Sequence, residues 1–160
     1  MHPRATAFVD CAREEYEFEP SVNEFPEGTK TAADAAEAIG CDVAQIASSL
    51  AFEADGDMIV SVTSGAHRAD EATLAEHVGV SPDALEMADP ERIKAHLGWS
   101  IGGVPPFCHE TPTPTFLDRT LLEFDTVWAA AGTPTAVFPI EPSVLQKLAD
   151  ADVVRVAASE

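Results

Sequence analysis

The residues best suited to chemistry lie in one stretch, Gly98-Trp99-Ser100-Ile101-Gly102-Gly103-Val104-Pro105-Pro106-Phe107-Cys108-His109. Gly102 and Gly103 lack a Cβ, so their backbone amides can approach a ligand closely, while Pro105 and Pro106 fix φ and stiffen the exit. Glycine and proline also mark ordinary connections between elements. The stretch therefore predicts either a connecting loop or a preorganised pocket wall that turns backbone N–H groups toward a ligand.

A thiol and an imidazole close this stretch, at Cys108 and His109. A cysteine nucleophile with a histidine base is one hypothesis, but such pairs are assembled from spatial neighbours and seldom from sequence neighbours. The alternative is that Cys108 packs as a small apolar residue and His109 lies at a pocket mouth or on the surface.

Two basic residues, His67 and Arg68, follow the expected end of a strand at Gly65. Ligand-binding residues often occupy such loops, and Arg68 is one of only six arginines in an acidic chain. A polyanion-binding role and an ion pair of Arg68 with Asp70 or Glu71 are both open hypotheses.

Three further side chains have a structural and a functional interpretation. Asp118 can orient a ligand at a strand end or cap the turn formed by residues 119–122. Trp99 and Trp128 can stack on a planar or acyl group, although tryptophan between apolar residues is more often part of the core.

No metal, cofactor or disulfide is expected. The three cysteines, Cys11, Cys41 and Cys108, are widely spaced without a CxxC pair, and reduced thiols are predicted. The histidines His2, His77 and His96 lack metal-ligand spacing, and neither a GxGxxG nor a Walker-type loop is present.

The composition fits one domain spanning residues 1–160, in which 46% of the side chains are hydrophobic. No apolar run is long enough to span a bilayer, so we expect no membrane partner and a cytoplasmic location. The formal charge of −19 is spread along the chain. Such a coat is screened in concentrated salt and predicts a halophilic cytoplasm, where repulsion from a polyanion is weak.

Capping residues and hydrophobic periodicity predict a mixed sheet with helices, of α+β class. Helices are expected at 3–16, 32–38, 70–77, from Ser81-Pro82, at 90–97 and at 142–148; strands are expected at 21–25, 43–52, 58–63, 115–118, 127–131, 136–140 and 153–157. The Asp-Gly pair at 55–56 predicts a hairpin between the strands that flank it.

Four segments together resemble the YbaK and prolyl-tRNA-synthetase editing-domain superfamily of aminoacyl-tRNA deacylases, in a haloarchaeal-like form. They are Ala32–Phe52, Thr63–Glu71, Gly98–His109 and Leu117–Pro134, and they follow the family's order. The resemblance implies a single α+β domain with a mixed, mostly antiparallel, partly barrel-like sheet surrounded by helices. Residues 1–30 are expected to form an N-terminal helix and lead-in.

The same resemblance implies a pocket for the aminoacylated 3′ end of a tRNA, where water hydrolyses the ester without a metal. Gly102 and Gly103 are then expected to hold the carbonyl oxygen by their amides, and Ser48 to take part in catalysis. The expected substrate-binding residues are Ser49, His67, Arg68, Trp99, Pro106, Asp118 and Gly132.

One position departs from the family. Members often have Ile-Val-Lys-Thr-Leu at the first hairpin strand, with a functional lysine, whereas this chain has Ile46-Ala47-Ser48-Ser49-Leu50. A hydroxyl cannot neutralise developing negative charge. One hypothesis is therefore a trans-acting deacylase, for example for alanine or cysteine on proline tRNA. The other is a weak or inactive module that binds aminoacyl-tRNA or a synthetase, and a thiol-dependent hydrolase is a third.

Overall fold

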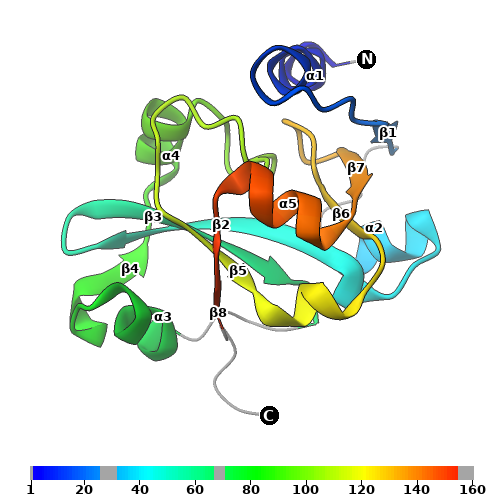
Figure 1. The fold of residues 1–160 in the computed structure, drawn as a ribbon. Coiled ribbons are helices and arrows are strands. Elements are labelled where there is room, and N and C mark those ends of the chain that lie inside the picture. Colours follow the sequence, from blue (N-terminus) through cyan, green and yellow to red (C-terminus); the bar gives the residue numbers. More distant parts are fainter. Residues whose placement is uncertain (1, 26–31, 67–70, 155–160) are drawn as a thin grey trace.

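The computed structural model describes residues 2–25, 32–66 and 71–154. The helices of these segments are α1 (Pro3–Tyr16), α2 (Ala32–Ile39), α3 (Glu71–Val78), α4 (Pro90–Leu97) and α5 (Pro142–Ala149). The strands are β1 (Asn23–Glu24), β2 (Ile46–Ala54), β3 (Asp57–Ser64), β4 (Leu85–Met87), β5 (Thr115–Asp118), β6 (Val127–Ala130), β7 (Ala136–Ile140) and β8 (Asp152–Val154). Figure 1 shows the β2–β3 hairpin crossing the molecule, with α3 and α4 near its turn and α2 near its other end.

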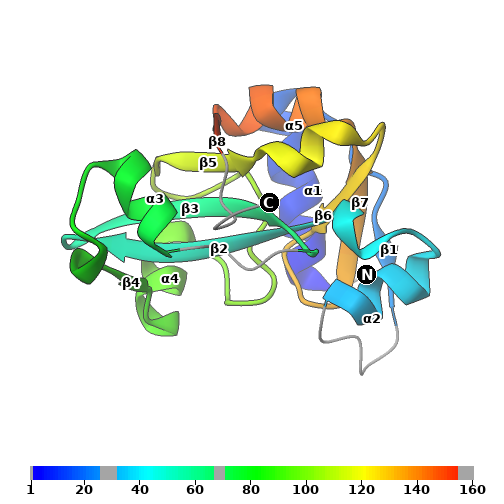
Figure 2. The same cartoon turned by 90° about the horizontal axis from the view of Figure 1, so that it is seen from below.

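The strands form one mixed sheet in the order β1-β7-β6-β2-β3-β5-β8, with β4 paired to β2 beside this path. Parallel pairs join β2 to β6, β3 to β5 and β5 to β8, and the other pairs are antiparallel. The predicted single α+β domain is confirmed. Figure 2 shows α5 and the β5–β8 end on one side of the hairpin and α4 on the other.

The hairpin turn is formed as the sequence predicts. Asp55 and Gly56 both have positive φ, of 52° and 90°, which the two-residue turn between right-twisted strands requires. The first strand of this hairpin, β2, begins at Ile46 and not at the expected residue 43, because residues 43–45 form a short 3-10 turn. The Asp42 carboxylate accepts from the N–H of Ala44, and Oε1 of Gln45 accepts from the backbone N–H of Asp42, each at 3.0 Å.

Most helix ends follow the local signals. α4 begins after the Asp89 cap with Pro90 in its first turn and ends at Gly98, whose φ is 84°. After Ser81 the expected helix is only a 3-10 turn, and β4 follows it, a strand that the sequence analysis missed. Thr31, which the sequence predicts as the cap of the helix at 32–38, the start of the helix at 70 and the end of the strand at 155–157 lie outside the described residues.

α1 is fixed to the sheet through an aromatic core. Phe8 is fully buried, and its ring centroid lies 4.9 Å from that of Phe138 on β7 and 5.5 Å from that of Phe107. Gly132 permits this approach, because a Cβ there would lie 2.6 Å from the carbonyl oxygen of Arg4 and 2.8 Å from the Trp99 ring.

The prediction of three reduced thiols is wrong. Cys11 on α1 and Cys108 form a disulfide, with their Cα atoms 6.2 Å apart and a sequence separation of 97. Only the packing of α1 on the sheet brings them together, and sequence spacing cannot show this. Cys41 is free, and burial raises the pKa of its thiol.

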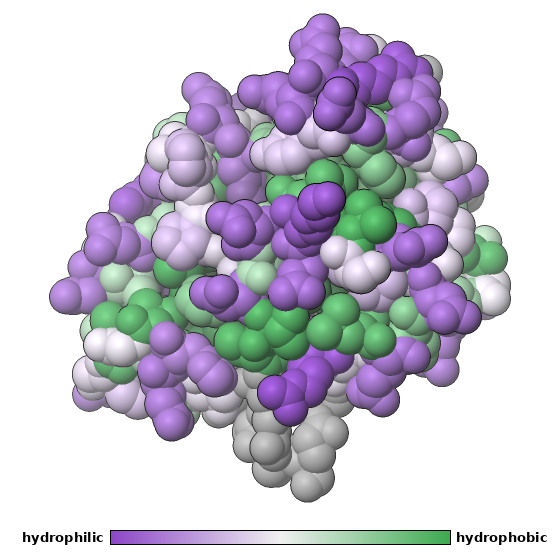
Figure 3. All heavy atoms as spheres, viewed as in Figure 1, coloured by the Kyte–Doolittle hydropathy of each residue, from purple (hydrophilic) through white to green (hydrophobic). Residues whose placement is uncertain are grey.

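Hydrophilic side chains cover much of the face in Figure 3, with apolar surface between them. Several of the few cations already have partners: Arg13 pairs with Glu19, Arg92 pairs with Glu53, and Arg4 lies over the Trp99 ring. No helix in the described segments is long and apolar enough to cross a membrane.

Candidate functional site

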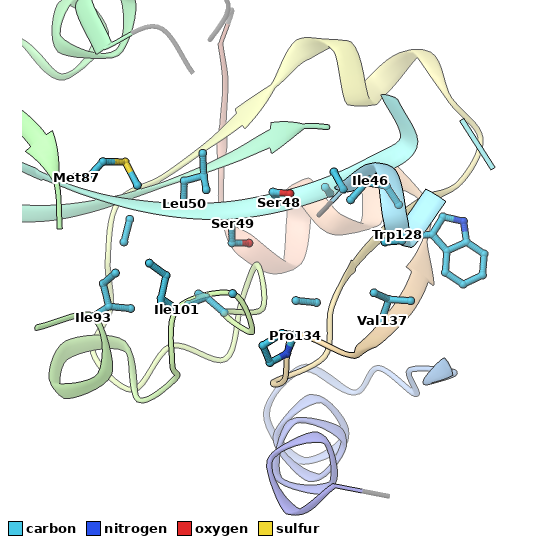
Figure 4. Close-up of a pocket in the computed structure, with 17 residues that line it drawn as sticks. Ile46, Ser48, Ser49, Leu50, Met87, Ile93, Ile101, Trp128, Pro134 and Val137 are labelled. Atoms are coloured by element: carbon cyan, nitrogen blue, oxygen red, sulfur yellow. The ribbon is translucent and has the colours of Figure 1, made fainter. Parts of the chain in front are cut away.

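A cavity of about 250 Å³ lies between the middle of β2 and the glycine-rich loop. Its volume is close to the lower end of small-molecule sites, which begin at roughly 300 Å³. Figure 4 shows Ser49 and Ile101 on facing walls and Pro134 below. Among the described residues, the lining is largely apolar and includes no charged side chain: Ala32, Ala35, Ile46, Ala47, Ser48, Ser49, Leu50, Ala51, Met87, Ile93, Ile101, Gly102, Val104, Trp128, Ala130, Pro134 and Val137.

A gap in the sheet creates the upper wall. One edge of β2 pairs with β3 along its whole length. The opposite edge pairs with β6 only at Ile46–Ala47 and with β4 only at Phe52–Ala54. Residues 48–51 therefore have no strand beside them in the described part of the chain, and the cavity occupies this gap.

The loop that follows α4 closes the cavity from the other side through Ile101, Gly102 and Val104. Gly102 has φ of 89°, and a Cβ there would touch the Pro134 ring at 3.4 Å. Glycine is thus required by the backbone conformation at this point. The loop and Ser48-Ser49, both singled out from the sequence, face one cavity.

Gly103 has a different environment from Gly102. Its N–H donates to the carbonyl oxygen of Ser100 at 3.0 Å, and it does not line the cavity. A Cβ on Gly103 would lie 2.7–2.9 Å from the backbone of Thr133. Gly103 therefore serves close packing, and its amide would have to leave Ser100 to reach a substrate.

The two serines differ in their surroundings. Both are half-buried and line the cavity. The Oγ of Ser49 is buried and has no hydrogen-bond partner, and no other buried side-chain N or O in the described segments shares this state. Such a hydroxyl costs about 1–3 kcal/mol until a partner reaches it.

The remaining described candidates do not line this cavity. Trp99 is buried in the core and its Nε1 donates to the carbonyl oxygen of Cys108 at 2.8 Å. Asp118 accepts from the N–H of Ser64 at 2.9 Å and of Thr120 at 3.0 Å, as a cap. Gly132 packs beneath α1.

Pro106 lines a second hollow together with His109, Tyr16 and Pro114, on the far side of the loop. His67 and Arg68 lie outside the described residues, so their placement at the cavity stays a prediction.

The cysteine-nucleophile hypothesis is wrong for the disulfide form, because Cys108 has no free thiol. His109 instead donates from Nε2 to the carbonyl oxygen of Pro105, at 2.8 Å. Burial lowers the pKa of His109, so the neutral imidazole is favoured there. Both residues hold the loop in place.

Sequence reasoning missed most of the apolar walls. Ile93 on α4, Val137 on β7, Ala130 on β6 and Pro134 all reach the cavity from separate elements. The Gly132-Thr133-Pro134 turn carried the one usable local signal, because a rigid turn beside a strand end often borders a site. Among the described residues, no three His, Cys, Asp or Glu side chains gather as metal ligands.

The fold is thus a mixed sheet with a gap beside the middle of β2, and the glycine–proline loop closes the small, largely apolar cavity at this gap. The sequence model of the aminoacyl-tRNA editing domain matches residues 26–148, and the chain belongs to this family. The predicted membership of the editing-domain superfamily is confirmed, and the haloarchaeal-like form stays a prediction.

Individual relatives agree with this assignment. The chain is 38% identical to a solved structure described as a candidate trans-editing enzyme for prolyl-tRNA synthetase, with a TM-score of 0.92 over 99% of both chains. It is 37% identical to a chain solved in work on epitope grafting onto scaffold proteins, with a TM-score of 0.91 over the full length of both. It is also 31% identical over 130 residues to the uncharacterized protein YwhH of Bacillus subtilis (strain 168), covering 81% of each chain.

Proposed function

We propose that this chain is a trans-acting aminoacyl-tRNA deacylase, which hydrolyses the ester of a mischarged tRNA of the proline type. Membership of the editing-domain family supports this activity. The observation that carries the proposal is the meeting of Ser48, Ser49 and Gly102 around one small cavity beside the open edge of β2. A relative described as a candidate trans-editing enzyme for prolyl-tRNA synthetase supports the choice of tRNA.

Hydrolysis at this site needs a held carbonyl and an attacking water. The N–H of Gly102 has no backbone partner in the described part of the chain, whereas that of Gly103 bonds to Ser100. We assign Gly102 as the donor that stabilises the oxyanion, a contribution on the order of 10²–10³ in rate for one such donor. The hydrogen bond from the Gly103 N–H to Ser100 fixes the turn that contains Gly102.

The apolar walls set the size of acyl group that enters. A small cavity of this kind separates groups that differ by one methylene by only about 1–3 kcal/mol. Met87, Ile93 and Val137 line it, and no charged side chain is among the described lining residues. We therefore expect small uncharged acyl groups such as alanyl or cysteinyl to be accepted.

The second candidate function is a binding module that recognises aminoacyl-tRNA, or a synthetase that carries it, with little or no hydrolysis. Ser48 favours this candidate, because it stands where family members often have lysine and because no described residue that lines the cavity is cationic. A neutral hydroxyl stabilises an anionic transition state less than an ammonium does.

One experiment separates the two candidates. The purified protein is incubated in molar KCl, which shrinks the Debye length to about 3 Å and weakens repulsion between the acidic protein and tRNA. A panel of mischarged tRNAs supplies the substrates. Ester loss above the spontaneous rate is expected for alanyl or cysteinyl proline tRNA. Retention of every ester would refute the enzyme and leave the binding module.

The Ser48→Lys variant tests the cause of low activity. If the missing cation limits catalysis, this variant hydrolyses the same ester faster than the natural chain. An unchanged or lower rate, in a variant that still unfolds cooperatively, would show that lysine at this position is not the missing element.

A further inference from the structure

The middle of β2 carries unpaired polar groups that face the cavity. The N–H of Gly65, just after β3, donates to the carbonyl oxygen of Ile46 at 2.8 Å. The C=O of Ile46 therefore points to the β3 edge of β2. The carbonyl oxygen of Ala51 accepts from the N–H of Ala88 at 3.0 Å, on the opposite edge. Backbone groups alternate between the two edges of an antiparallel strand. The N–H and C=O of Ser49 must therefore point into the gap.

No described strand lies opposite Ser49 to take these bonds. Pairing with β6 stops at Ala47, opposite Ala129, and pairing with β4 starts at Phe52, opposite Met87. The unpartnered Oγ of Ser49 adds a third polar atom at the same place. Figure 4 shows this side chain on the side of β2 that faces Ile101.

The three polar groups of Ser49, in a cavity whose described lining is mostly apolar, indicate what a ligand beside β2 must supply. Buried N–H and C=O groups are almost always paired, so a ligand that fills the gap has to offer both an acceptor and a donor. An aminoacyl group does so, with an ammonium donor and a carbonyl acceptor separated by one carbon atom, as in a strand residue. Short extended ligands bind sheet edges by this match.

We propose that Ser49 determines specificity by recognising the free α-amino group of the aminoacyl ester. The aminoacyl group then takes the position of the missing strand residue opposite Ser49. Its ammonium donates to the carbonyl oxygen and Oγ of Ser49, and its ester carbonyl accepts from the Ser49 N–H. This inference rests on the proposed function and adds the chemical feature that the site selects.

Binding to two stable ligands tests the inference without requiring hydrolysis. One ligand is 3′-alanylamino-3′-deoxyadenosine, an amide that mimics the aminoacylated end, and the other is its N-acetyl derivative. Calorimetry in molar KCl is expected to show at least about tenfold weaker binding of the N-acetyl compound, which corresponds to about 1.4 kcal/mol. Equal affinities would overturn the inference and leave the proposed function standing. If neither compound binds, the proposed function fails and the inference fails with it.

The Ser49→Ala variant supplies a second test, because stability and ligand binding are expected to change in different directions. Removing an unpaired buried hydroxyl is expected to keep or raise the thermal unfolding midpoint, because no hydrogen bond is lost in the free protein. The same change is expected to weaken binding of the free-amino ligand about fivefold or more and to reduce the discrimination against the N-acetyl ligand. Ser143→Ala, an exposed serine on α5, is the matched control. Unchanged discrimination in Ser49→Ala would count against a role for the hydroxyl, and a lower midpoint would show that it is structural.

Discussion

The two halves of the glycine–proline loop differ in what they contact. In residues 100–104, Ile101, Gly102 and Val104 border the cavity, where Ile101 is 52% exposed and Gly102 lies against Pro134. Residues 105–109 are held against α1, with Phe107 only 2% exposed and Cys108 joined to Cys11. The packing of residues 105–109 on α1 holds the loop in position. The cavity side of the first half is thereby left available to contact a ligand. A preorganised site therefore needs an anchor outside the family-matched region, which begins at residue 26.

Removing the centre of the anchor is expected to have the largest effect. Phe8→Ala leaves a cavity among the rings of Phe107, Phe138 and Trp99. The free energy of unfolding should fall by about 3–5 kcal/mol, measured by denaturant titration in molar KCl. The partly exposed Leu122 offers a control, since Leu122→Ala should change it by about 0.5 kcal/mol or less. A loss below about 1 kcal/mol in Phe8→Ala would mean that α1 does not anchor the loop.

The disulfide is expected to contribute less than the aromatic core. Cys11→Ser removes a link across 97 residues and should lower the free energy of unfolding by about 2–4 kcal/mol. A thiol reductant should lower the stability of the natural chain by a similar amount and leave the variant unchanged. Cys41→Ser, at the free cysteine, serves as the control. Equal sensitivity of Cys11→Ser and the natural chain to reductant would contradict the assigned pairing.

His109 is expected to make a smaller, pH-dependent contribution to the free energy of unfolding. Burial holds its pKa below the ordinary value of 6.5, so on acidification the unfolded chain binds this proton before the folded chain does. Stability should therefore be unaffected by His109 well above pH 6.5 and decrease as the pH falls below it. Denaturant titrations between about pH 7.5 and 5.5 should show a shallower decrease in His109→Gln. Parallel pH profiles for the two proteins would exclude this contribution.

Substitutions in the half of the loop that borders the cavity should change the free energy of unfolding only slightly. Ile101→Ala is expected to change the free energy of unfolding by about 0.5 kcal/mol or less, because its side chain is half exposed. Ligand affinity should nevertheless fall severalfold, since the methyl groups removed line the cavity. Binding of the alanyl amide by calorimetry measures this. A large loss of stability would place Ile101 in the anchor and erase the difference between the two halves.

Local signals were sufficient for most of the fold. The Asp55-Gly56 turn, the Asp89-Pro90 start of α4 and the Gly98 stop each depend on the chemistry of one to three neighbouring residues. β4 escaped prediction because its three residues form a strand only through pairing with β2. Short elements of this kind are set by tertiary contacts and not by propensity.

The site was only partly predictable for the same reason. Gly102 and Ser49 could be named because the loop composition and the family resemblance marked their segments. Which amide stays unpaired, and that Gly103 bonds to Ser100, depends on the turn geometry. The Cys11–Cys108 disulfide forms because α1 packs against the loop, and the spacing of the cysteines in the sequence cannot predict this contact.

The gap beside β2 also bears on how the protein avoids self-association. Unpaired strand edges invite other chains to add a strand and are a frequent route to aggregation. In the described part of the chain the open edge covers residues 48–50, or roughly 10 Å, because the carbonyl oxygen of Ala51 already accepts from Ala88. It is bounded at one end by β6 and at the other by β4. A second copy cannot lay an extended strand along it, whereas a ligand the size of one residue fits. The same flanking strands that shape the pocket thus keep a reactive sheet edge from acting as a template for aggregation.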